Sequence, residues 1–332
     1  MSENRIHNIQ NRLILIKAKE MGIEGKLLIP GCEDFLTLKY KDKELIINKT
    51  RSDRLPLIAG LLARNKDACS LLLRRMGLPV PEYMIVAEMS GELPDFLNRN
   101  KKVVVKPLDA SRSTGVTTGI EREADLIDAI HTARLHSELV IVQKHISGYD
   151  CRVLVINGEV AGVLEYQPAF VEGDGNSTIG QLIDSLNEER LGRHGAREFE
   201  TLKVIRRDSE RLLKNLASQG RTLRNILEKK ERVQLFYSSD IETEDEITEI
   251  VIDRTEEICK ANAEMAVRAA QALNIDVAGI DFRCEDISLP LNPESEGILE
   301  VNALPDLTDH IFPFRGKSRD VAGVYLRYLF KE

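Results

Sequence analysis

The stretch "GILEVNA", residues 297–303, alternates apolar and oxygen-bearing side chains. Because successive side chains on a strand point to opposite faces, we expect Glu300 and Asn302 on one face and their apolar neighbours on the other. A second stretch, "VAGIDF" at residues 277–282, places Asp281 among apolar residues. If the two strands lie side by side, two carboxylates and one amide meet on the same face of a sheet.

This oxygen cluster has two interpretations. Two carboxylates that approach closely cannot both stay ionised at low cost without a nearby cation. Hard oxygen ligands of this kind suit Mg²⁺, which keeps several waters and shares its coordination shell with phosphate oxygens. The alternative is that Asp281 and Glu300 are solvated acids on an edge strand.

A lysine-bearing strand and loop, "VVVKPLDASRSTGV" at residues 103–116, complements the acidic cluster. Three valines lead to Lys106, and a second lysine, Lys66, lies upstream. A lysine is a compact charge for phosphate, and hydroxyl and backbone N–H groups are further donors. The donors in the loop are Ser111, Ser113, Thr114 and Gly115. The spacing fits neither a P-loop nor a dinucleotide-binding loop, so a surface lysine before an ordinary polar turn is the alternative.

Composition narrows the class of protein. The chain has 332 residues, 42% of them hydrophobic, which is enough for a sizeable core in two domains or lobes. Its net charge of -8 gives no basic footprint for nucleic acid or for an anionic membrane. The cysteines are scattered without CxxC spacing, which is typical of a reduced compartment. The N-terminus has no apolar leader, and no stretch approaches the about 18 apolar residues of a membrane span, so we expect a cytoplasmic protein.

Hydrophobic periodicity predicts a mixed α/β architecture. Short apolar strands alternate with helical stretches, while Asn157-Gly158 between two alternating runs predicts an antiparallel hairpin. Asn65 and Gly77 delimit one predicted helix as its start and stop signals. The expected helices are residues 9–21, 65–76, 123–136, 179–187 and one that starts at Cys259. The expected strands are residues 26–29, 44–47, 103–105, 139–142, 277–282 and 297–303.

Several motifs, in this order, resemble the ATP-grasp carboxylate-amine ligases, and most closely the ATP-grasp module of cyanophycin synthetase. The matching stretches are "TRSDRLPLIAGLLARNKDACSLLLRRMGLPVP" (50–81), "VVVKPLD" (103–109), "VIVQKHISGYDCRVLVINGEVAG" (140–162), "PAFVEGDGNSTIGQLID" (168–184), "DVAGIDF" (276–282), "ILEVNALPDL" (298–307) and "GVYLRYLF" (323–330). The resemblance implies an ATP-grasp fold in which two lobes clamp ATP. It implies an N-terminal α/β unit at residues 1–64, a small nucleotide-clamping lobe at 65–147 and a large lobe with the metal and substrate site at 148–332.

The resemblance also implies a task for each matching residue. Lys66 and Lys106 would contact the α and β phosphates of ATP, and residues 109–116 would fold over the β and γ phosphates. Arg152 resembles an arginine near the γ-phosphate, so the implied catalytic residues are Arg152 and Lys106. The implied nucleotide contacts in the hinge are Gln143, Lys144, His145 and Ile146 for adenine and Asp150 for ribose. The implied ligands of Mg²⁺, or of Mn²⁺ in its place, are Asp281, Glu300 and Asn302.

The implied activity is the ATP-dependent joining of an amino acid or peptide carboxylate to an amine through an acyl-phosphate, with release of ADP and phosphate. The substrates would be small molecules, with no nucleic acid and no membrane as partner. Relatives of this type are often dimers, so a homodimer is one state that the resemblance allows. A glutathione-synthetase-like or γ-glutamyl ligase is the alternative enzyme. A nucleotide-binding regulatory or scaffold protein is the alternative outside enzymes.

Some positions depart from the family pattern and leave the substrate open. Pro305-Asp306 stands where Pro-Gly is usual, and Gln143 stands where an acid is common. His310 and Arg319 lie just beyond the metal strand and are candidates for holding a substrate carboxylate, with a surface role as the alternative. The acidic run at residues 242–249 would attract a cationic acceptor or form a solvated face. The basic stretch at 203–215 would form a helix surface, or Arg206 or Arg207 in it would bind an acidic substrate.

Overall fold

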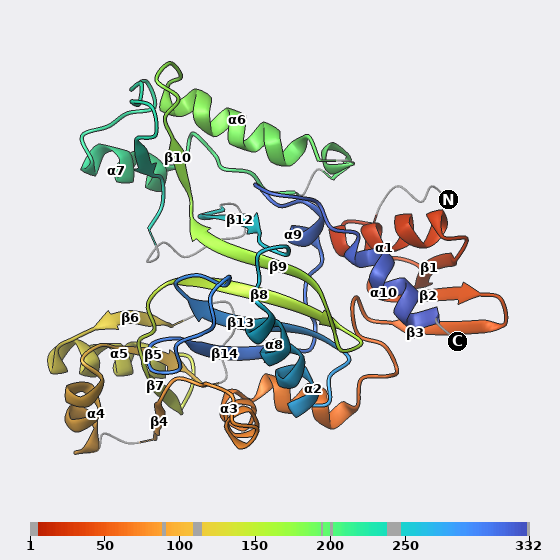
Figure 1. The fold of residues 1–332 in the computed structure, drawn as a ribbon, viewed down its shortest axis with the longest axis horizontal. Helices are drawn as coiled ribbons and strands as arrows, with labels where there is room; N and C mark the ends of the chain where they lie inside the picture. Colours follow the sequence, from red (N-terminus) through yellow and green to blue (C-terminus); the bar gives the residue numbers. More distant parts are fainter. Residues whose placement is uncertain are drawn as a thin grey trace. The chain divides into compact units, whose positions relative to one another are not determined.

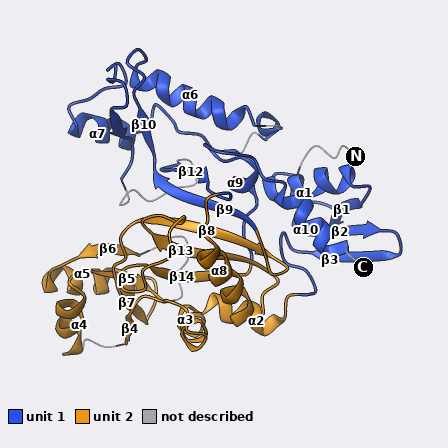
Figure 2. Cartoon of the chain, viewed as in Figure 1, with its two compact units in different colours: residues 1–54, 161–256, 304–332 blue, residues 55–160, 257–303 orange. Residues whose placement is uncertain are grey.

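The structure is a computed structural model that describes residues 6–87, 91–108, 115–193, 195–199, 202–237 and 247–330. Figure 1 shows helices and β-sheets mixed along the chain, as predicted. The chain forms two compact units, which Figure 2 colours separately. Unit 1 contains residues 1–54, 161–256 and 304–332, and unit 2 contains residues 55–160 and 257–303. The division into 1–64, 65–147 and 148–332 has other boundaries and stays a prediction.

The N-terminal part of unit 1 is a helix packed on a three-stranded antiparallel sheet. The helix α1 (Ile9–Glu20) contacts β1 (Glu24–Ile29), β2 (Cys32–Tyr40) and the C-terminal helix α10 (Val321–Phe330). The sheet has the order β1-β2-β3, with β3 at Lys43–Ile47. The predicted helix at residues 9–21 and the strands at 26–29 and 44–47 are thereby confirmed, while β2 was not predicted.

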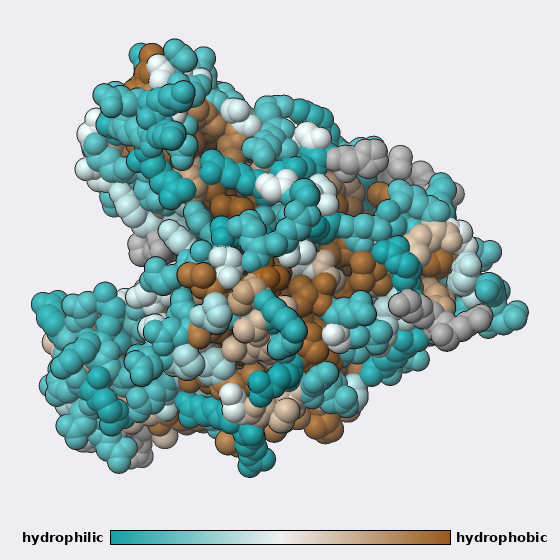
Figure 3. All heavy atoms as spheres, in the orientation of Figure 1, coloured by the Kyte–Doolittle hydropathy of each residue, from teal (hydrophilic) through white to brown (hydrophobic). Residues whose placement is uncertain are grey.

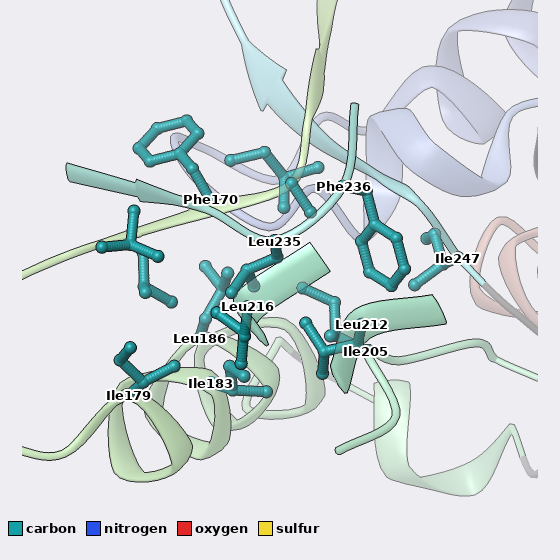
Figure 4. Close-up of a cluster of buried hydrophobic side chains, with 14 of the residues drawn as sticks. Phe170, Ile179, Ile183, Leu186, Ile205, Leu212, Leu216, Leu235, Phe236 and Ile247 are labelled. Atoms are coloured by element: carbon teal, nitrogen blue, oxygen red, sulfur yellow. The ribbon is translucent and has the colours of Figure 1, made fainter. Parts of the chain in front are cut away.

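The middle of unit 1 is built around a hydrophobic core (Figure 4). Side chains from two helices, α6 (Ile179–Leu191) and α7 (Glu210–Ser218), point toward those of a short β-ribbon. The ribbon pairs β10 (Phe170–Glu172) antiparallel with β11 (Arg232–Gln234). The predicted helix at residues 179–187 is confirmed and extends further. The remaining elements of unit 1 are β9 (Glu159–Pro168), which starts in unit 2, η1 (Ala196–Glu198), β12 (Glu249–Asp253) and α9 (Thr308–Ile311).

Unit 2 contains a four-stranded antiparallel sheet with the order β4-β7-β5-β6. Its strands are β4 (Tyr83–Val86), β5 (Val103–Pro107), β6 (Thr117–Ile120) and β7 (Val140–Lys144). Two amphipathic helices, α4 (Glu92–Asn100) and α5 (Glu123–Arg134), share a core with this sheet. The buried residues of that core include Phe96, Val103, Val105, Leu126, Ile130 and Val142. The sheet presents Lys106 and Gln143 at adjacent strands, because β5 pairs with β7.

A second group of antiparallel strands in unit 2 carries the acidic residues. The strand β13 (Val277–Cys284) pairs with β8 (Tyr149–Ile156) on one side and with β14 (Gly297–Asn302) on the other. The helix α8 (Lys260–Ala272) contacts β8 and β13, and α3 (Lys66–Arg75) contacts β14 and α8. The remaining helix of the unit is α2 (Leu57–Arg64), which precedes α3 in the chain. Both β13 and β14 lie where the alternating pattern predicts strands.

Turn and cap residues in unit 2 explain where its elements begin and end. Asn157 and Gly158 have φ angles of 53° and 77°, the left-handed conformation that their two-residue turn requires. Asn65 caps α3 because its side chain accepts a hydrogen bond from the Ala68 backbone N–H at 2.9 Å. Gly77, with a φ of 68°, follows the end of the same helix. These predicted signals are confirmed.

The face of the molecule shown in Figure 3 is mostly hydrophilic, as expected for a chain with 30% charged residues. Within the part of the chain that the structure describes, no helix combines the length and the apolar character needed to cross a membrane.

Candidate functional site

The two acidic strands pair in the register that brings their oxygen-bearing side chains together. Asp281 lies opposite Glu300, and Gly279 lies opposite Asn302. Asn302 Nδ2 donates to Asp281 Oδ2 at 2.9 Å and to Glu300 Oε1 at 3.1 Å. The expected cluster of two carboxylates and one amide therefore exists on one face of β13 and β14.

The electrostatics of this cluster show how costly two adjacent carboxylates are. Burial raises the pKa of Glu300, and the neighbouring charge of Asp281 raises it further, while the hydrogen bond from Asn302 opposes the shift. Among the described residues, no group of three or more His, Cys, Asp or Glu side chains is placed to hold a metal. The cluster nevertheless fits a hard cation once the Asn302 amide turns, because the nitrogen that now faces both acids is then replaced by an oxygen, which is also a hard ligand.

Two lysines lie beside the acidic cluster. Burial lowers the pKa of Lys106 to about 8, with the charge of Lys66 acting in the same direction and the charges of Glu300 and Asp150 opposing it. Lys66 Nζ donates to the carbonyl of Leu108 at 3.2 Å. Unit 2 therefore brings Lys106 within electrostatic range of Glu300, a predicted metal ligand, and brings Lys66 within electrostatic range of Lys106.

Two arginine–aspartate pairs lie side by side across β8 and β13. Arg152 is directly opposite Asp281, and its Nε and Nη2 atoms donate to the two carboxylate oxygens at 2.7 Å each. Two residues along, Asp150 is opposite Arg283, whose Nη1 atom donates to Oδ1 at 2.8 Å. Arg283 Nε also donates to the carbonyl of Ile146 at 3.0 Å. Asp281 and Asp150 are thus each held by an arginine.

The predicted adenine-binding residues lie at and after the end of β7. Gln143 is buried, and Lys144 Nζ donates to the carbonyl of Glu294 at 2.6 Å. The backbone N–H of His145 donates to the carbonyl of Lys102 at 3.0 Å. Burial lowers the pKa of His145, and the charges of Arg283 and Lys102 add to this shift. The hinge segment is therefore well anchored within unit 2.

The predicted phosphate loop is described only at its end. Ser111, Ser113 and Thr114 lie outside the described residues. Gly115 has a φ of 68°, and an added Cβ would lie 2.7 Å from the His136 ring. This position requires glycine because of its backbone angle and because of the close side chain.

The predicted substrate residues lie in unit 1. His310 is fully buried, and Arg319 Nη2 and Nε donate to the carboxylate of Asp253 at 2.5 and 3.0 Å. Arg319 Nη1 also lies 3.3 Å from Glu256. His310 is thus enclosed by protein and Arg319 is ion-paired, and the contact of either side chain with a substrate stays a prediction.

The structure describes the basic stretch at residues 203–215 but only the end of the acidic run at 242–249. Of the acidic run at residues 242–249, residues 242–246 lie outside the described part of the chain. In the basic stretch, Arg206 pairs with Asp208 at 2.9 Å and Arg207 with Asp184 at 2.8 Å, all on the surface. These pairs favour the interpretation of the basic stretch as a solvated surface.

Sequence analysis missed two residues of the site. Arg283 follows Asp281 by two positions on the same strand, so the period of two places both on one face and could have revealed it. Cys69 lies one turn after Lys66 on α3, and burial raises its thiol pKa to about 11. The Val301 backbone and the charge of Lys106 oppose that shift, so Cys69 lies against the cluster.

Comparison with known proteins relates this geometry to a family. Residues 76–190 match the ATP-grasp domain of prokaryotic glutathione synthetase. The crystal structure of a bifunctional glutathione synthetase from Pasteurella multocida covers 97% of this chain with a TM-score of 0.75 and 27% identity. The chain has the ATP-grasp fold. The predicted fold class is therefore confirmed.

Curated relatives of this chain include proteins of two kinds. Cyanophycin synthetase from Synechocystis sp. is 33% identical over 88% of this chain. The glutathione biosynthesis bifunctional protein from Pasteurella multocida is 28% identical over 98% of it. The chain spans 33% of the first relative, 43% of the second, and 44% of the protein in the crystal structure. It therefore corresponds to one part of each of these longer proteins.

Proposed function

We propose that the chain is an ATP-dependent carboxylate–amine ligase. It would activate the carboxylate of an amino acid or peptide as an acyl-phosphate and join it to an amine, with release of ADP and phosphate. The observation that carries this proposal is the meeting of Asp281, Glu300 and Asn302 on one face, with Lys106 in electrostatic contact with Glu300. A triphosphate with its metal ion needs both kinds of charge, and unit 2 supplies both.

The residues of unit 2 divide between the nucleotide and the metal. Lys66 and Lys106 would hold phosphate oxygens, because each is a compact charge that phosphate attracts. Asp281, Glu300 and the amide oxygen of Asn302 would hold Mg²⁺ or Mn²⁺, which when bound neutralises charge on the phosphates. The hinge residues Gln143, Lys144, His145 and Ile146 would hold adenine, and Asp150 would hold ribose. Ser111, Ser113, Thr114 and Gly115 would close on the phosphates.

The protein's part in the reaction is positional and electrostatic. Negative charge spreads over the transferred phosphoryl group in the transition state, so fixed cations nearby lower the barrier. Lys106 lies beside Glu300, and Arg152 lies beside Asp281, so both cations adjoin the metal ligands. We assign these two side chains to stabilising the phosphoryl group while a substrate carboxylate attacks it. An amine then displaces phosphate from the acyl-phosphate.

The relatives suggest the class of substrate. Enzymes named cyanophycin synthetase and glutathione synthetase are among them, so the substrates proposed here are amino acids or short peptides. A glutathione-synthetase-like or γ-glutamyl ligase is the second candidate, and it is favoured by the alignment of the bifunctional enzyme over 97% of this chain. His310 and Arg319 stay the proposed substrate residues. A cytoplasmic location and a homodimer remain predictions from the sequence.

ADP release tests the proposal. The chain is incubated with ATP, Mg²⁺ and amino acids or dipeptides, singly and in pairs, and the products are weighed by mass spectrometry. We expect ADP release with a productive pair and a product equal in mass to the two substrates less one water. Glu300→Gln should lower the rate by about a hundredfold or more, while Glu264→Gln on the exposed side of α8 should not. ATP binding without ADP release, whichever pair is supplied, would favour the nucleotide-binding scaffold instead.

A further inference from the structure

The two arginine–aspartate pairs on β8 and β13 are reversed copies of each other. Arg152 on β8 reaches Asp281 on β13, and Arg283 on β13 reaches Asp150 on β8. Because the residues of each strand are two apart, all four side chains lie on the same face. Only one of the four, Asp281, belongs to the proposed metal ligands.

The carboxylate of Asp281 accepts three hydrogen bonds. Arg152 donates to both of its oxygens at 2.7 Å, and Asn302 donates to Oδ2 at 2.9 Å. A carboxylate has about four acceptor positions, so three are taken. A divalent cation needs at least one of these oxygens as a direct ligand. Because Arg152 donates to both oxygens, a cation on either of them would share that oxygen with the guanidinium, and the two positive groups repel each other.

We propose that Arg152 neutralises Asp281 in the metal-free protein and yields it only when nucleotide phosphates bind the guanidinium. This inference rests on the proposed function. A paired guanidinium is a strong, bidentate partner, so a cation alone must displace it from Asp281 and lose both of these charge-assisted hydrogen bonds. A nucleotide removes that penalty, because phosphate oxygens match the guanidinium in geometry and charge. Metal and nucleotide then enter together.

The reversed pair provides a matched control. Arg283 makes the same kind of contact on the same two strands, but its partner Asp150 is not a proposed metal ligand. Arg283 is also tied to the carbonyl of Ile146, which supports a structural role for it. Neutralising Arg283 therefore removes one positive charge from the same face without freeing a metal ligand.

Mn²⁺ binding to the nucleotide-free chain tests the inference. Free Mn²⁺ is measured by electron paramagnetic resonance during titration of wild type, Arg152→Gln, Arg283→Gln and Asp281→Asn. We expect Arg152→Gln to bind Mn²⁺ at least about fivefold more tightly than wild type, a typical coupling between two sites. Arg283→Gln should stay within about twofold of wild type, because it affects only the long-range charge. Saturating ADP should tighten Mn²⁺ binding more in wild type than in Arg152→Gln.

Unchanged or weaker Mn²⁺ binding by folded Arg152→Gln would overturn the inference, and so would equal tightening by both arginine variants. Arg152→Lys serves if the glutamine variant does not fold, because it keeps the charge and loses the bidentate contact. It should tighten Mn²⁺ binding by a smaller factor, and no tightening counts against the inference. The Mn²⁺ titration needs no turnover. A wild type that releases no ADP contradicts the proposed function and leaves this readout intact.

Discussion

The amide nitrogen of Asn302 lies 2.9 Å from a carboxylate oxygen of Asp281. The same nitrogen donates to Glu300 at 3.1 Å, so one neutral side chain bridges two acids. This amide, together with the guanidinium of Arg152 on Asp281, lowers the repulsion between the carboxylates without a metal ion. The cluster is therefore compatible with a folded chain before any metal binds.

Replacing that amide by a carboxylate should destabilise the metal-free protein. Asn302→Asp removes two donated hydrogen bonds and adds a third negative charge beside a buried acid, so we expect a loss of about 2 kcal/mol in the free energy of unfolding. Urea unfolding with EDTA and with Mg²⁺ measures this. Mg²⁺ should restore more stability to Asn302→Asp than to Asn302→Leu, which lacks the added charge. Equal stability of the aspartate variant and wild type in EDTA contradicts the expectation.

Nucleotide binding should weaken as the pH rises through about 8. Burial lowers the pKa of Lys106 to about 8, so this lysine is charged below that pH and becomes neutral above it. Phosphates bind the charged form, so affinity is fully present below about pH 8 and falls above it by up to about tenfold per pH unit. Calorimetric titration with ADP measures the profile. Lys106→Met should bind weakly with a flatter profile, and a flat profile in wild type would count against this role.

The ion pair between Arg319 and Asp253 should contribute to the stability of the fold. Burial would raise the pKa of Asp253, but hydrogen bonds from Arg319 and Thr255 bring it below its ordinary value. The pair thus stabilises the fold above the ordinary pKa of aspartate, and this contribution disappears as the pH falls through the lowered value. Arg319→Met leaves Asp253 buried and unpaired from this arginine, so we expect a loss of about 3 kcal/mol near neutral pH.

Urea unfolding at several pH values tests this expectation, with Lys317→Met as the control. Lys317 pairs with Glu256 on the surface, so its replacement should cost less than about 1 kcal/mol. Comparable small losses in both variants would show that the Arg319 pair contributes little to stability.

Gly148 should tolerate no side chain, because both its backbone angle and its surroundings require glycine. Its φ is 94°, and an added Cβ would lie 2.2 Å from the backbone oxygen of Cys284. Gly22 has a φ of 72° with nothing within 4 Å, so it isolates the cost of the backbone angle. Gly22→Ala should lose about 1 kcal/mol, and Gly148→Ala clearly more. Thermal unfolding measures both variants. Equal losses of stability would mean that the backbone at Cys284 moves aside at little cost and would contradict this prediction.

Local geometry allowed much of the site to be predicted from sequence. The period of two along a strand places Glu300 and Asn302 on one face whatever the rest of the chain does, and the cap at Asn65 depends on its neighbours alone. The strand β2 was missed although residues 36–40 alternate apolar and polar side chains, which is the pattern that favours a strand. The three-residue strands β10 and β11 escaped because each gains its strand form by pairing with the other.

The sequence by itself determined which strands carry acids and lysines and which faces those side chains share, because backbone periodicity is a local property. Tertiary structure alone decided which cation neutralises each acid. Arg152 and Asp281 are 129 residues apart, and Asp150 and Arg283 are 133 apart, so only the register of β8 against β13 brings them together. No short turn joins these two strands to fix their register, so it depends on packing the apolar faces of both strands into one core.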